Sequence, residues 1–468
     1  MAGMPDRCAV LWFRRDLRLA DHPALLAATE RAQSVLALYV LDDRLIGRAG
    51  VPRLAFNYRC LRALDHQLGG RLLVVRGDPA DVVPAVARAC GAGTVHVSAD
   101  TAPYGRRRDA AVATALAEAG AELVATGSPY AVTPGRVRKP DGTPYRVFTP
   151  FSKAWLRHGW RGPAATGVSL ARWVDPGDVD VRPAAIPADP DLSEVALPEA
   201  GEEAALAAWR RFRDDGLADY DARRDRPDAD GTSMLSPYLR WGCLHPRTLL
   251  TDLDTASGAG AASFRNELAW REFHADVLWH RPDTARRNYD ERFDALWWRP
   301  GPDAEPLFDA WRQGRTGYPI VDAGMRQLVR HGWMHNRVRM VVASFLVKDL
   351  HLPWQWGARH FMRHLVDGDL ASNQLNWQWV AGSGTDAAPY FRVFNPTTQG
   401  QKFDPDGGYV RAHVPELRGI AGKAVHQPWR LAAAERGDYP LPVVDHATER
   451  QEALRRYGEY VTGRAAPS

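Results

Sequence analysis

The chain has 468 residues, 45% apolar and 25% charged, which fits a soluble protein with room for two domains. With no long apolar run and no signal-peptide start, we expect a cytoplasmic protein, and four scattered cysteines without a CxxC pair argue against a disulfide framework or zinc cluster. The formal net charge is only +4 and the basic residues are almost all arginines, which indicates either a local phosphate-binding surface or codon bias alone.

Residues 8–126 alternate short apolar runs with amphipathic stretches. The predicted strands are "CAVLWF", "SVLALYVL", "RLLVVRG", "TVHVSA" and "AELVAT", with candidate helices over 53–68 and 107–119. This order predicts a Rossmann-like five-stranded parallel sheet with flanking helices. The segment after the first strand, "RRDLRLADHPAL", lacks the glycines of a dinucleotide fingerprint, which argues against an NAD site.

Helical periodicity dominates the chain from about residue 201 to 463. Before it, residues 161–200 are rich in Pro, Ala, Gly and Asp, as long connecting loops are. We therefore predict an α/β domain over 1–130, an interdomain linker over 131–200 and a larger all-α domain over 201–468.

One predicted helix has an unusual polar face. In "ASFRNELAWREFHADVLWH", Glu267, Trp270, Arg271 and His274 fall at i, i+3, i+4 and i+7, while Phe264, Leu268 and Val277 are left for the core. A face that mixes an acid, an indole and a guanidinium group suits the wall of a polar pocket. The alternative is a partly exposed ion pair under a packed tryptophan.

The segment "DGDLASNQLNWQW", residues 367–379, concentrates acids, amides and indoles. A helix capped near Asp369 would stack Asp369, Asn373 and Trp377 at i, i+4 and i+8, which predicts a polar ladder. Nearby, His360 and His364 have the i, i+4 spacing of two zinc ligands. The glutamate of HExxH and a third ligand are missing, so we predict no metal site.

Five segments together carry a family resemblance: "GTSMLSPYLRWG" (231–242), "ELAWREF" (267–273), "GYPIVDAGMRQL" (317–328), "WMHNRVRMVVASFLVKDL" (333–350) and "DGDLASNQLNWQWVAGSGTDAAPYFRVFNPTTQGQKFD" (367–404). The chain resembles the photolyase and cryptochrome family, and "LWFRRDLRLADHPAL" is similar to that family's N-terminal signature. The likeness runs from about residue 8 to 425 in the family's order. Within the family it is most similar to the class I enzymes that repair cyclobutane pyrimidine dimers (CPDs).

The resemblance implies FAD in the helical domain, folded so that its adenine lies near the isoalloxazine ring. In this family the excited, reduced flavin lends one electron to the dimer, so the protein holds and tunes the flavin. The TSxLS segment would follow the diphosphate, and Asn373 would face N5 of the ring. The implied flavin-binding residues are Tyr220, Thr232, Ser233, Leu235, Ser236, Arg271, Asn336, Arg339, Asp367, Asp369 and Asn373, with Arg339 and Asp367 forming an ion pair.

The resemblance also gives roles to several tryptophans. Trp377, Trp354 and Trp298 match the family's chain of three that carries electrons from the surface to FAD, with Trp297 as an alternative end of that chain. Trp270 matches the ring that packs against the dimer, and Trp379 lies near the same cavity. Without the family pattern, core packing is the ordinary explanation for each tryptophan.

For the lesion, the resemblance favours a CPD over a (6-4) photoproduct. Enzymes acting on the latter carry two histidines where this chain has Asn336 and Met340. Glu267 and Asn336 would bond the thymine carbonyl edges, and Trp270 and Met340 would supply apolar contact. The partner would be UV-damaged DNA with its dimer flipped out of the stack. Phosphate contacts are implied for Arg224, Arg337 and Arg392 by family position and for Lys402 by proximity.

Many relatives carry a second, light-harvesting pigment in the N-terminal domain. Folate-binding members have an Asn-Glu pair where this chain has Tyr104 and Gly105, so the resemblance favours a deazaflavin over methenyltetrahydrofolate. Asp100 is a candidate contact, and an empty site is the alternative.

Other functions remain open at this point. A cryptochrome-type blue-light photoreceptor would share the fold and FAD but would signal instead of repairing DNA, and a (6-4) photolyase would repair a different lesion. A pyridine-nucleotide flavoenzyme would need the glycines that are missing after the first strand. We expect a monomer that binds no membrane and is associated with the nucleoid when bound to DNA.

Overall fold

The chain forms two compact units in the computed structural model, which describes residues 7–193, 195–295, 301–385 and 392–461. The first unit consists of Met1–Leu192, Pro198–Ala218 and Ser233–Pro282, and the second of Ser193–Leu197, Asp219–Thr232 and Asp283–Ser468. Both units are therefore discontinuous in sequence. The domain bounds expected from composition group the residues differently and stay a prediction.

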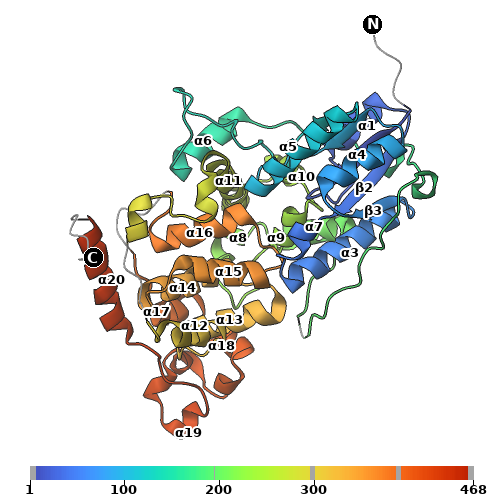
Figure 1. The fold of residues 1–468 in the computed structure, drawn as a ribbon. Coiled ribbons are helices and arrows are strands. Elements are labelled where there is room, and N and C mark those ends of the chain that lie inside the picture. Colours follow the sequence, from blue (N-terminus) through green and yellow to red (C-terminus); the bar gives the residue numbers. More distant parts are fainter. Residues whose placement is uncertain (1–6, 194, 296–300, 386–391, 462–468) are drawn as a thin grey trace. The chain divides into compact units, whose positions relative to one another are not determined.

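The first unit contains a five-stranded parallel sheet with the strand order β3-β2-β1-β4-β5 (Figure 1). Its strands are β1 (Ala9–Phe13), β2 (Val35–Leu41), β3 (Leu72–Arg76), β4 (Thr94–Val97) and β5 (Glu122–Ala125). In register, Leu11 of β1 lies opposite Ala37 of β2 and His96 of β4. Each strand lies within one predicted apolar run, so the predicted Rossmann-like sheet is confirmed.

Strands β1 to β4 are largely buried because helices cover the sheet, whereas the edge strand β5 is partly exposed. Alternate strand side chains, among them Val10, Trp12 and Leu38, share one core with Val86 of α4 and Val112 of α5. The helices of this unit are α1 (Pro23–Arg31), α2 (Asp43–Ile46), α3 (Val51–Gln67), α4 (Pro79–Ala89), α5 (Pro103–Glu118), α6 (Phe148–His158), α7 (Glu202–Asp215), α9 (Ser236–Trp241), α10 (Pro246–Thr255) and α11 (Ala259–His280), with 3-10 turns η1 (Val168–Leu170) and η2 (Pro176–Asp178).

The two predicted helices correspond to α3 and α5, and both begin earlier than expected. Pro52 and Pro103 stand in their first turns, where a missing backbone N–H costs no hydrogen bond. The segment 161–200 contains only η1 and η2 among its described residues, as a connecting loop would. Helix α6 lies in the predicted linker 131–200 and was not anticipated.

The second unit is helical over its described residues. It comprises α8 (Tyr220–Arg223), α12 (Ala304–Arg312), α13 (Pro319–His331), α14 (Asn336–Ser344), α15 (Trp354–His364), α16 (Leu370–Ala381), α17 (Pro396–Phe403), α18 (Gly408–His413), α19 (Ala433–Arg436) and α20 (His446–Val461), the 3-10 turns η3 (Pro282–Ala285), η4 (Glu291–Ala295), η6 (Pro415–Leu417), η7 (Gly422–His426) and η8 (Pro428–Arg430), and the π-helix η5 (Phe345–Asp349). Its core lies among α13, α14, α15, α16 and η5. A Cβ at Gly357 of α15 would lie 2.1 Å from the Trp377 ring of α16, so glycine permits their close approach.

Two further expectations concern the whole chain. All four cysteines are free thiols, and Cys8, Cys60 and Cys243 are buried among apolar side chains as small hydrophobic residues are. In the part of the chain that the structure describes, no helix has the length and apolar character needed to cross a bilayer.

Candidate functional site

The polar face predicted for 267–274 lies on α11 of the first unit. Trp270 is partly exposed and its ring stacks on Phe148 of α6, with centroids 3.7 Å apart and planes 6° from parallel. His274 is buried beside it, at 5.5 Å between ring centroids. Phe264, Leu268 and Val277 are buried as predicted. The face therefore presents one indole whose ring is already held by a second aromatic residue.

Arg271, on the same helix, is held within the first unit. Its guanidinium donates to the carbonyls of Pro129 at 3.0 Å and Leu239 at 3.1 Å, and it lies 4.4 Å from the centre of the Tyr130 ring. These contacts fix the direction of a charge that the family resemblance assigns to the flavin.

Glu272 is a residue of this region that sequence reasoning missed. Its buried carboxylate accepts hydrogen bonds from the backbone N–H groups of Ala131 and Val132 and from Trp155 Nε1 of α6. Burial raises the pKa of Glu272 to about 7, and the three donors oppose that rise. Glu272 falls four residues after Leu268 on the buried side of α11, and an acid at such an apolar helix position is the signal that could have identified it.

The TSxLS segment enters α9. Leu235 is 2% exposed, and its backbone N–H donates to Ser233 Oγ at 3.4 Å. Met234 has φ +52°, a left-handed conformation that a non-glycine residue adopts only where the surroundings impose it. Ser236 is the exposed first residue of α9. Thr232 belongs to the second unit.

In the second unit, an ion pair joins α14 to the start of the 367–379 segment. Arg339 Nη2 lies 2.8 Å from Asp367 Oδ2 and Nη1 lies 3.3 Å from Oδ1, a bidentate arrangement. Arg339 Nε also donates to the Met334 carbonyl at 2.7 Å. The ion pair that the resemblance implies is therefore formed in this unit. Asn336 is the exposed first residue of α14, and Met340 is partly exposed one turn later.

The predicted ladder lies on α16. Asp369 is the N-cap and accepts from the Ser372 N–H at 3.1 Å, as predicted. Asn373 is buried, and its Nδ2 donates to the Ala358 carbonyl at 3.2 Å and to Gln374 Oε1 at 2.8 Å. Because both amide hydrogens are engaged, Asn373 has its Oδ1 acceptor to offer a further partner.

Two of the three tryptophans assigned to electron transfer are described, and both are buried. Trp354 Nε1 donates to Asn288 Oδ1 at 2.9 Å, and the Trp377 ring lies 6.2 Å from Trp311. Trp379 is partly exposed. Trp298 and its neighbour Trp297 lie outside the described residues.

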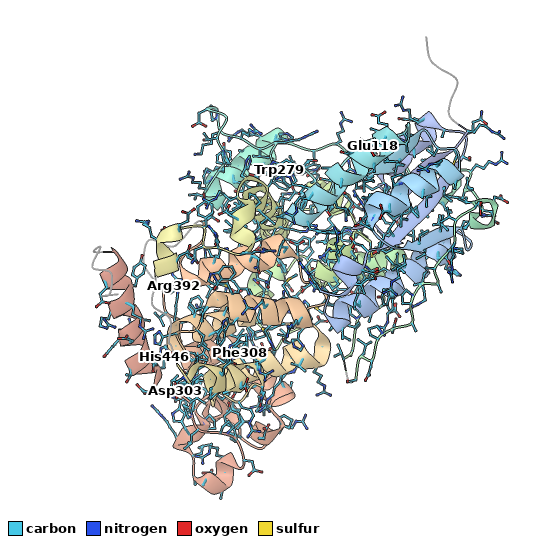
Figure 2. The ribbon with its side chains drawn as sticks, in the orientation of Figure 1. Glu118, Trp279, Asp303, Phe308, Arg392 and His446 are labelled. Carbon is cyan, nitrogen blue, oxygen red and sulfur yellow. The ribbon has the colours of Figure 1, made fainter. Side chains whose placement is uncertain are left out.

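A cavity of about 500 Å³ in the second unit brings together three of the four predicted phosphate contacts. It is lined by Asp225, Arg337, Arg392, Asn395, Lys402 and Phe403. Arg392, labelled in Figure 2, and Lys402 are exposed. Arg337 is paired with Asp225, at 2.8 Å between Nη2 and Oδ2, and lies 4.6 Å from the centre of the Phe403 ring.

Arg224, the fourth predicted contact, does not line this cavity. Its guanidinium lies 5.4 Å from the centre of the buried Tyr220 ring, a residue assigned to the flavin. The basic surface is therefore built by α14, by the segment leading into α17 and by α17 itself.

The residues discussed for a second pigment lie in the first unit. Tyr104 donates from its hydroxyl to Asp42 Oδ2, and Asp100 lies 3.3 Å from Arg108 Nη2. Burial opposes ionisation of Asp100, but Arg108, Arg15 and Arg14 outweigh it and lower its pKa. A Cβ at Gly105 would lie 2.1 Å from Asp100 Cγ. Asp100 as it stands therefore leaves no room for a side chain at the position where the family's folate-binding members have glutamate.

His360 and His364 are four residues apart on α15, and their ring centroids lie 4.4 Å from each other. Over the described ranges, His, Cys, Asp and Glu side chains do not gather in any group of three suited to a metal ion.

Comparisons with known proteins place these features in a family. Residues 9–168 match the DNA photolyase family model, and residues 264–459 match the model of the FAD binding domain of DNA photolyase. A deoxyribodipyrimidine photo-lyase of Streptomyces griseus is 44% identical over 463 residues, which are 96% of this chain and 99% of that protein.

Two solved structures are similar over nearly the whole chain. A bacterial class III photolyase from Agrobacterium tumefaciens has a TM-score of 0.86 and 38% identity, covering 98% of this chain and 99% of that one. An archaeal photolyase from Sulfolobus tokodaii, described with two FAD molecules, has a TM-score of 0.83 and 28% identity, covering 97% and 100%. The chain belongs to the DNA photolyase family.

Proposed function

We propose that this protein is a light-dependent DNA repair enzyme that splits cyclobutane pyrimidine dimers. The observation that carries the proposal is the 44% identity to a deoxyribodipyrimidine photo-lyase over 96% of this chain and 99% of that protein. The name of that relative states a deoxyribodipyrimidine substrate and a light-dependent lyase reaction. A second relative of the same name, from Escherichia coli, is 40% identical over 96% of this chain.

FAD is the cofactor that the match to the FAD binding domain of DNA photolyase supports. Reduced FAD held at this site would supply the blue-light-driven one-electron chemistry that splitting a dimer needs. The donor set suits it: hydroxyls at Thr232, Ser233 and Ser236 suit a diphosphate, and Asn373 Oδ1 suits an N–H donor on a reduced ring. We assign to FAD Tyr220, Thr232, Ser233, Leu235, Ser236, Arg271, Asn336, Arg339, Asp367, Asp369 and Asn373.

Around the flavin, the polypeptide would hold charged groups in fixed positions. The Arg339–Asp367 pair holds a fixed dipole with the carboxylate side chain only 4% exposed. Preorganised charges of this kind need no rearrangement when charge moves in the site. Trp377, Trp354 and Trp298 would relay electrons from the protein surface to the flavin.

For the lesion, we propose that Glu267 and Asn336 bind the thymine carbonyl edges, while Trp270 and Met340 provide apolar contact and Trp379 lies near the same cavity. Asn336 and Met340, instead of two histidines, favour the CPD over the (6-4) photoproduct. Extruding the dimer costs a few kcal/mol and costs least at a damaged pair, so the lesion itself adds selectivity.

For DNA, we propose phosphate contacts from Arg337, Arg392 and Lys402, which share one cavity, and from Arg224. Salt would weaken such binding steeply because bound phosphates release counterions. We further propose a cytoplasmic monomer that associates with the nucleoid when it binds damaged DNA.

A second chromophore in the first unit is also proposed, with Asp100 among its contacts. The Sulfolobus structure described with two FAD molecules supports a flavin-type occupant over a folate, as does Gly105 in place of the glutamate. A deazaflavin remains our proposal for it. The enzyme class stays open, because the Agrobacterium structure is described as class III.

Light-dependent repair tests the proposed function. Reduced, FAD-loaded protein is mixed with CPD-containing DNA and illuminated with blue light, and the recovery of thymine absorbance is followed against a dark control. We expect recovery only in the light. Recovery with (6-4) DNA alone would reassign the lesion, and no recovery from a fully reduced sample would favour a cryptochrome-type receptor.

A further inference from the structure

Helix α6 lies between the sheet and the helical segments in sequence, in a region where we expected a linker. Its burial pattern is amphipathic: Phe148, Phe151, Ser152 and Trp155 fall at i, i+3, i+4 and i+7 and are buried, while Leu156 is exposed. The buried stripe packs on α11, which carries Glu267, Trp270 and Arg271 (Figure 1).

Three side-chain contacts join α6 to α11. Phe148 stacks on Trp270, Phe151 lies 5.2 Å from Phe273 between ring centroids, and Trp155 donates to Glu272 Oε2 at 2.5 Å. The three α6 side chains thus meet Trp270, Phe273 and Glu272, which lie within four consecutive positions of α11. The last contact is a hydrogen bond to a buried carboxylate, which fixes the helix along its axis.

The stack at Trp270 differs from the other ring contacts of this group. Its planes are 6° from parallel at 3.7 Å, whereas Phe148 meets Phe273 at 68° and 6.0 Å, and Trp270 meets Phe273 at 73° and 5.8 Å. Phe148 therefore covers one face of the indole, and Phe273 abuts its side. Trp270 remains partly exposed, so its uncovered surface is what a ligand would meet.

We infer that Phe148 is a positioning residue for lesion recognition, acting through Trp270. This inference rests on the proposed function, in which Trp270 packs against the dimer. An indole that rotates freely would lose rotamer entropy on binding, whereas a ring held by a stacked partner has lost it beforehand. An aromatic pair contributes about 0.5–1.5 kcal/mol beyond its buried area, which corresponds to about twofold to tenfold in affinity.

The experiment compares binding in the dark, where no repair occurs. Reduced, FAD-loaded protein is titrated onto a fluorescent duplex with a single CPD and onto the same duplex without it. The Phe148→Leu variant keeps apolar volume but removes the ring, and Phe148→Tyr keeps the ring. The matched control is Phe151→Leu, on the same helix and packed on the same partner helix, with described ring contacts to Tyr145 and Phe273.

We expect Phe148→Leu to weaken CPD binding about twofold to tenfold and to leave binding of the undamaged duplex unchanged. Phe148→Tyr should bind CPD DNA as the wild type does. Phe151→Leu should lower thermal stability without changing the preference for CPD DNA. In a Trp270→Ala background, Phe148→Leu should have no further effect. A loss that persists in that background, an equal loss in Phe151→Leu, or tighter CPD binding by Phe148→Leu would overturn the inference.

The proposed function is tested separately by the parent proteins. If the wild-type protein did not prefer CPD DNA, or Trp270→Ala bound it as tightly as wild type, the assignment of Trp270 to the lesion would fail first. Only when both parents behave as proposed does the Phe148 result bear on the role of α6.

Discussion

At the scale of single residues, the Arg339–Asp367 pair is the clearest unit of the candidate flavin site. Two hydrogen bonds join a carboxylate that is 4% exposed to a guanidinium that is 23% exposed. Asp367→Asn removes the negative charge and leaves the guanidinium partly uncompensated. We expect the free energy of unfolding to fall by about 2 kcal/mol, as for hydrogen bonds to charged groups. We also expect the variant to retain less FAD on gel filtration.

The control for Asp367 is a pair of the same type on the surface. Arg312 and Asp309 of α12 lie 2.7 Å apart with side chains 47% and 45% exposed. Asp309→Asn should change the free energy of unfolding by less than about 0.5 kcal/mol. Guanidinium unfolding of both variants measures the contrast, and equal losses would refute the view that burial sets the cost.

A second residue-scale prediction concerns acid stability. Burial, with His364 and Arg312 adding to it, lowers the pKa of His360 from 6.5 to about 3, and its Nε2 has no hydrogen-bond partner among the described residues. Between about pH 6.5 and 3, His360 is therefore protonated in the unfolded chain and neutral in the folded one. Stability is full above pH 6.5 and falls as the pH drops, by at most about 1.4 kcal/mol per pH unit.

His360→Phe keeps a ring against Trp311, which lies 5.5 Å from His360 between centroids, and removes the titration. Chemical unfolding from pH 7 to 4.5 should show a shallower loss of stability than in wild type. The exposed His158, changed to Gln, is the control and should leave the wild-type profile intact. Parallel profiles for His360→Phe and wild type would mean that this histidine titrates normally in the folded chain.

At the scale of elements, the π-helix η5 and the end of α14 hold the segment that precedes α17. Lys348 Nζ donates to the Arg392 carbonyl, and Ser344 Oγ accepts from the Phe394 N–H at 3.3 Å. Lys348 is 4% exposed, and burial lowers its pKa to about 7. Since Arg392 lines the basic cavity, Lys348→Met should weaken binding to damaged and undamaged duplexes alike, by about fivefold.

Anisotropy titrations with both duplexes measure this effect, and the ratio of the two affinities should stay constant. Lys423→Met removes the same charge from an exposed side chain in turn η7 and serves as the control. If both lysine variants lost affinity equally, net charge alone would explain the result. The constant ratio also separates Lys348 from Phe148, whose loss should be confined to damaged DNA.

Elements with a local signal were predictable from the sequence. Each strand lies in an apolar run, and an acid before an amphipathic stretch predicts the helix that Asp369 caps. The role of Glu272 and the packing of α6 against α11 were missed for one reason. The Glu272 carboxylate meets groups of Ala131 and Trp155, more than a hundred positions away, and periodicity within a window does not contain such pairings.

The assignment of chemistry to the candidate site had another origin. No periodicity identifies Asn373 as a flavin contact or Trp354 as an electron carrier; the family's motifs do so. What the structure adds is the state of each group, such as the two engaged amide hydrogens of Asn373 and the pairing of Arg337 with Asp225. Both contacts limit which donor and acceptor groups of these side chains can bind a ligand.

At the scale of the whole molecule, a net charge of +4 predicts that DNA binding depends on a local surface. If Arg392 and Lys402 each contact one phosphate, Arg392→Gln and Lys402→Gln should each reduce the slope of log affinity against log salt by about 0.9. Titrations at several salt concentrations measure the slopes, with Lys423→Met as the variant expected to keep the wild-type value. An unchanged slope in all three would remove the basic cavity from the DNA interface.

The interleaved course of the two units has a consequence for how the protein is made. The first unit is assembled from three stretches of chain, the last of which ends at Pro282, and Asp219–Thr232 of the second unit is synthesised before that point. A ribosome adding about 5–20 residues per second has therefore passed α6 well before α11 emerges to cover the apolar face of α6. Until then the nascent chain carries α6 with Phe148, Phe151 and Trp155 uncovered, the kind of apolar surface that chaperones bind.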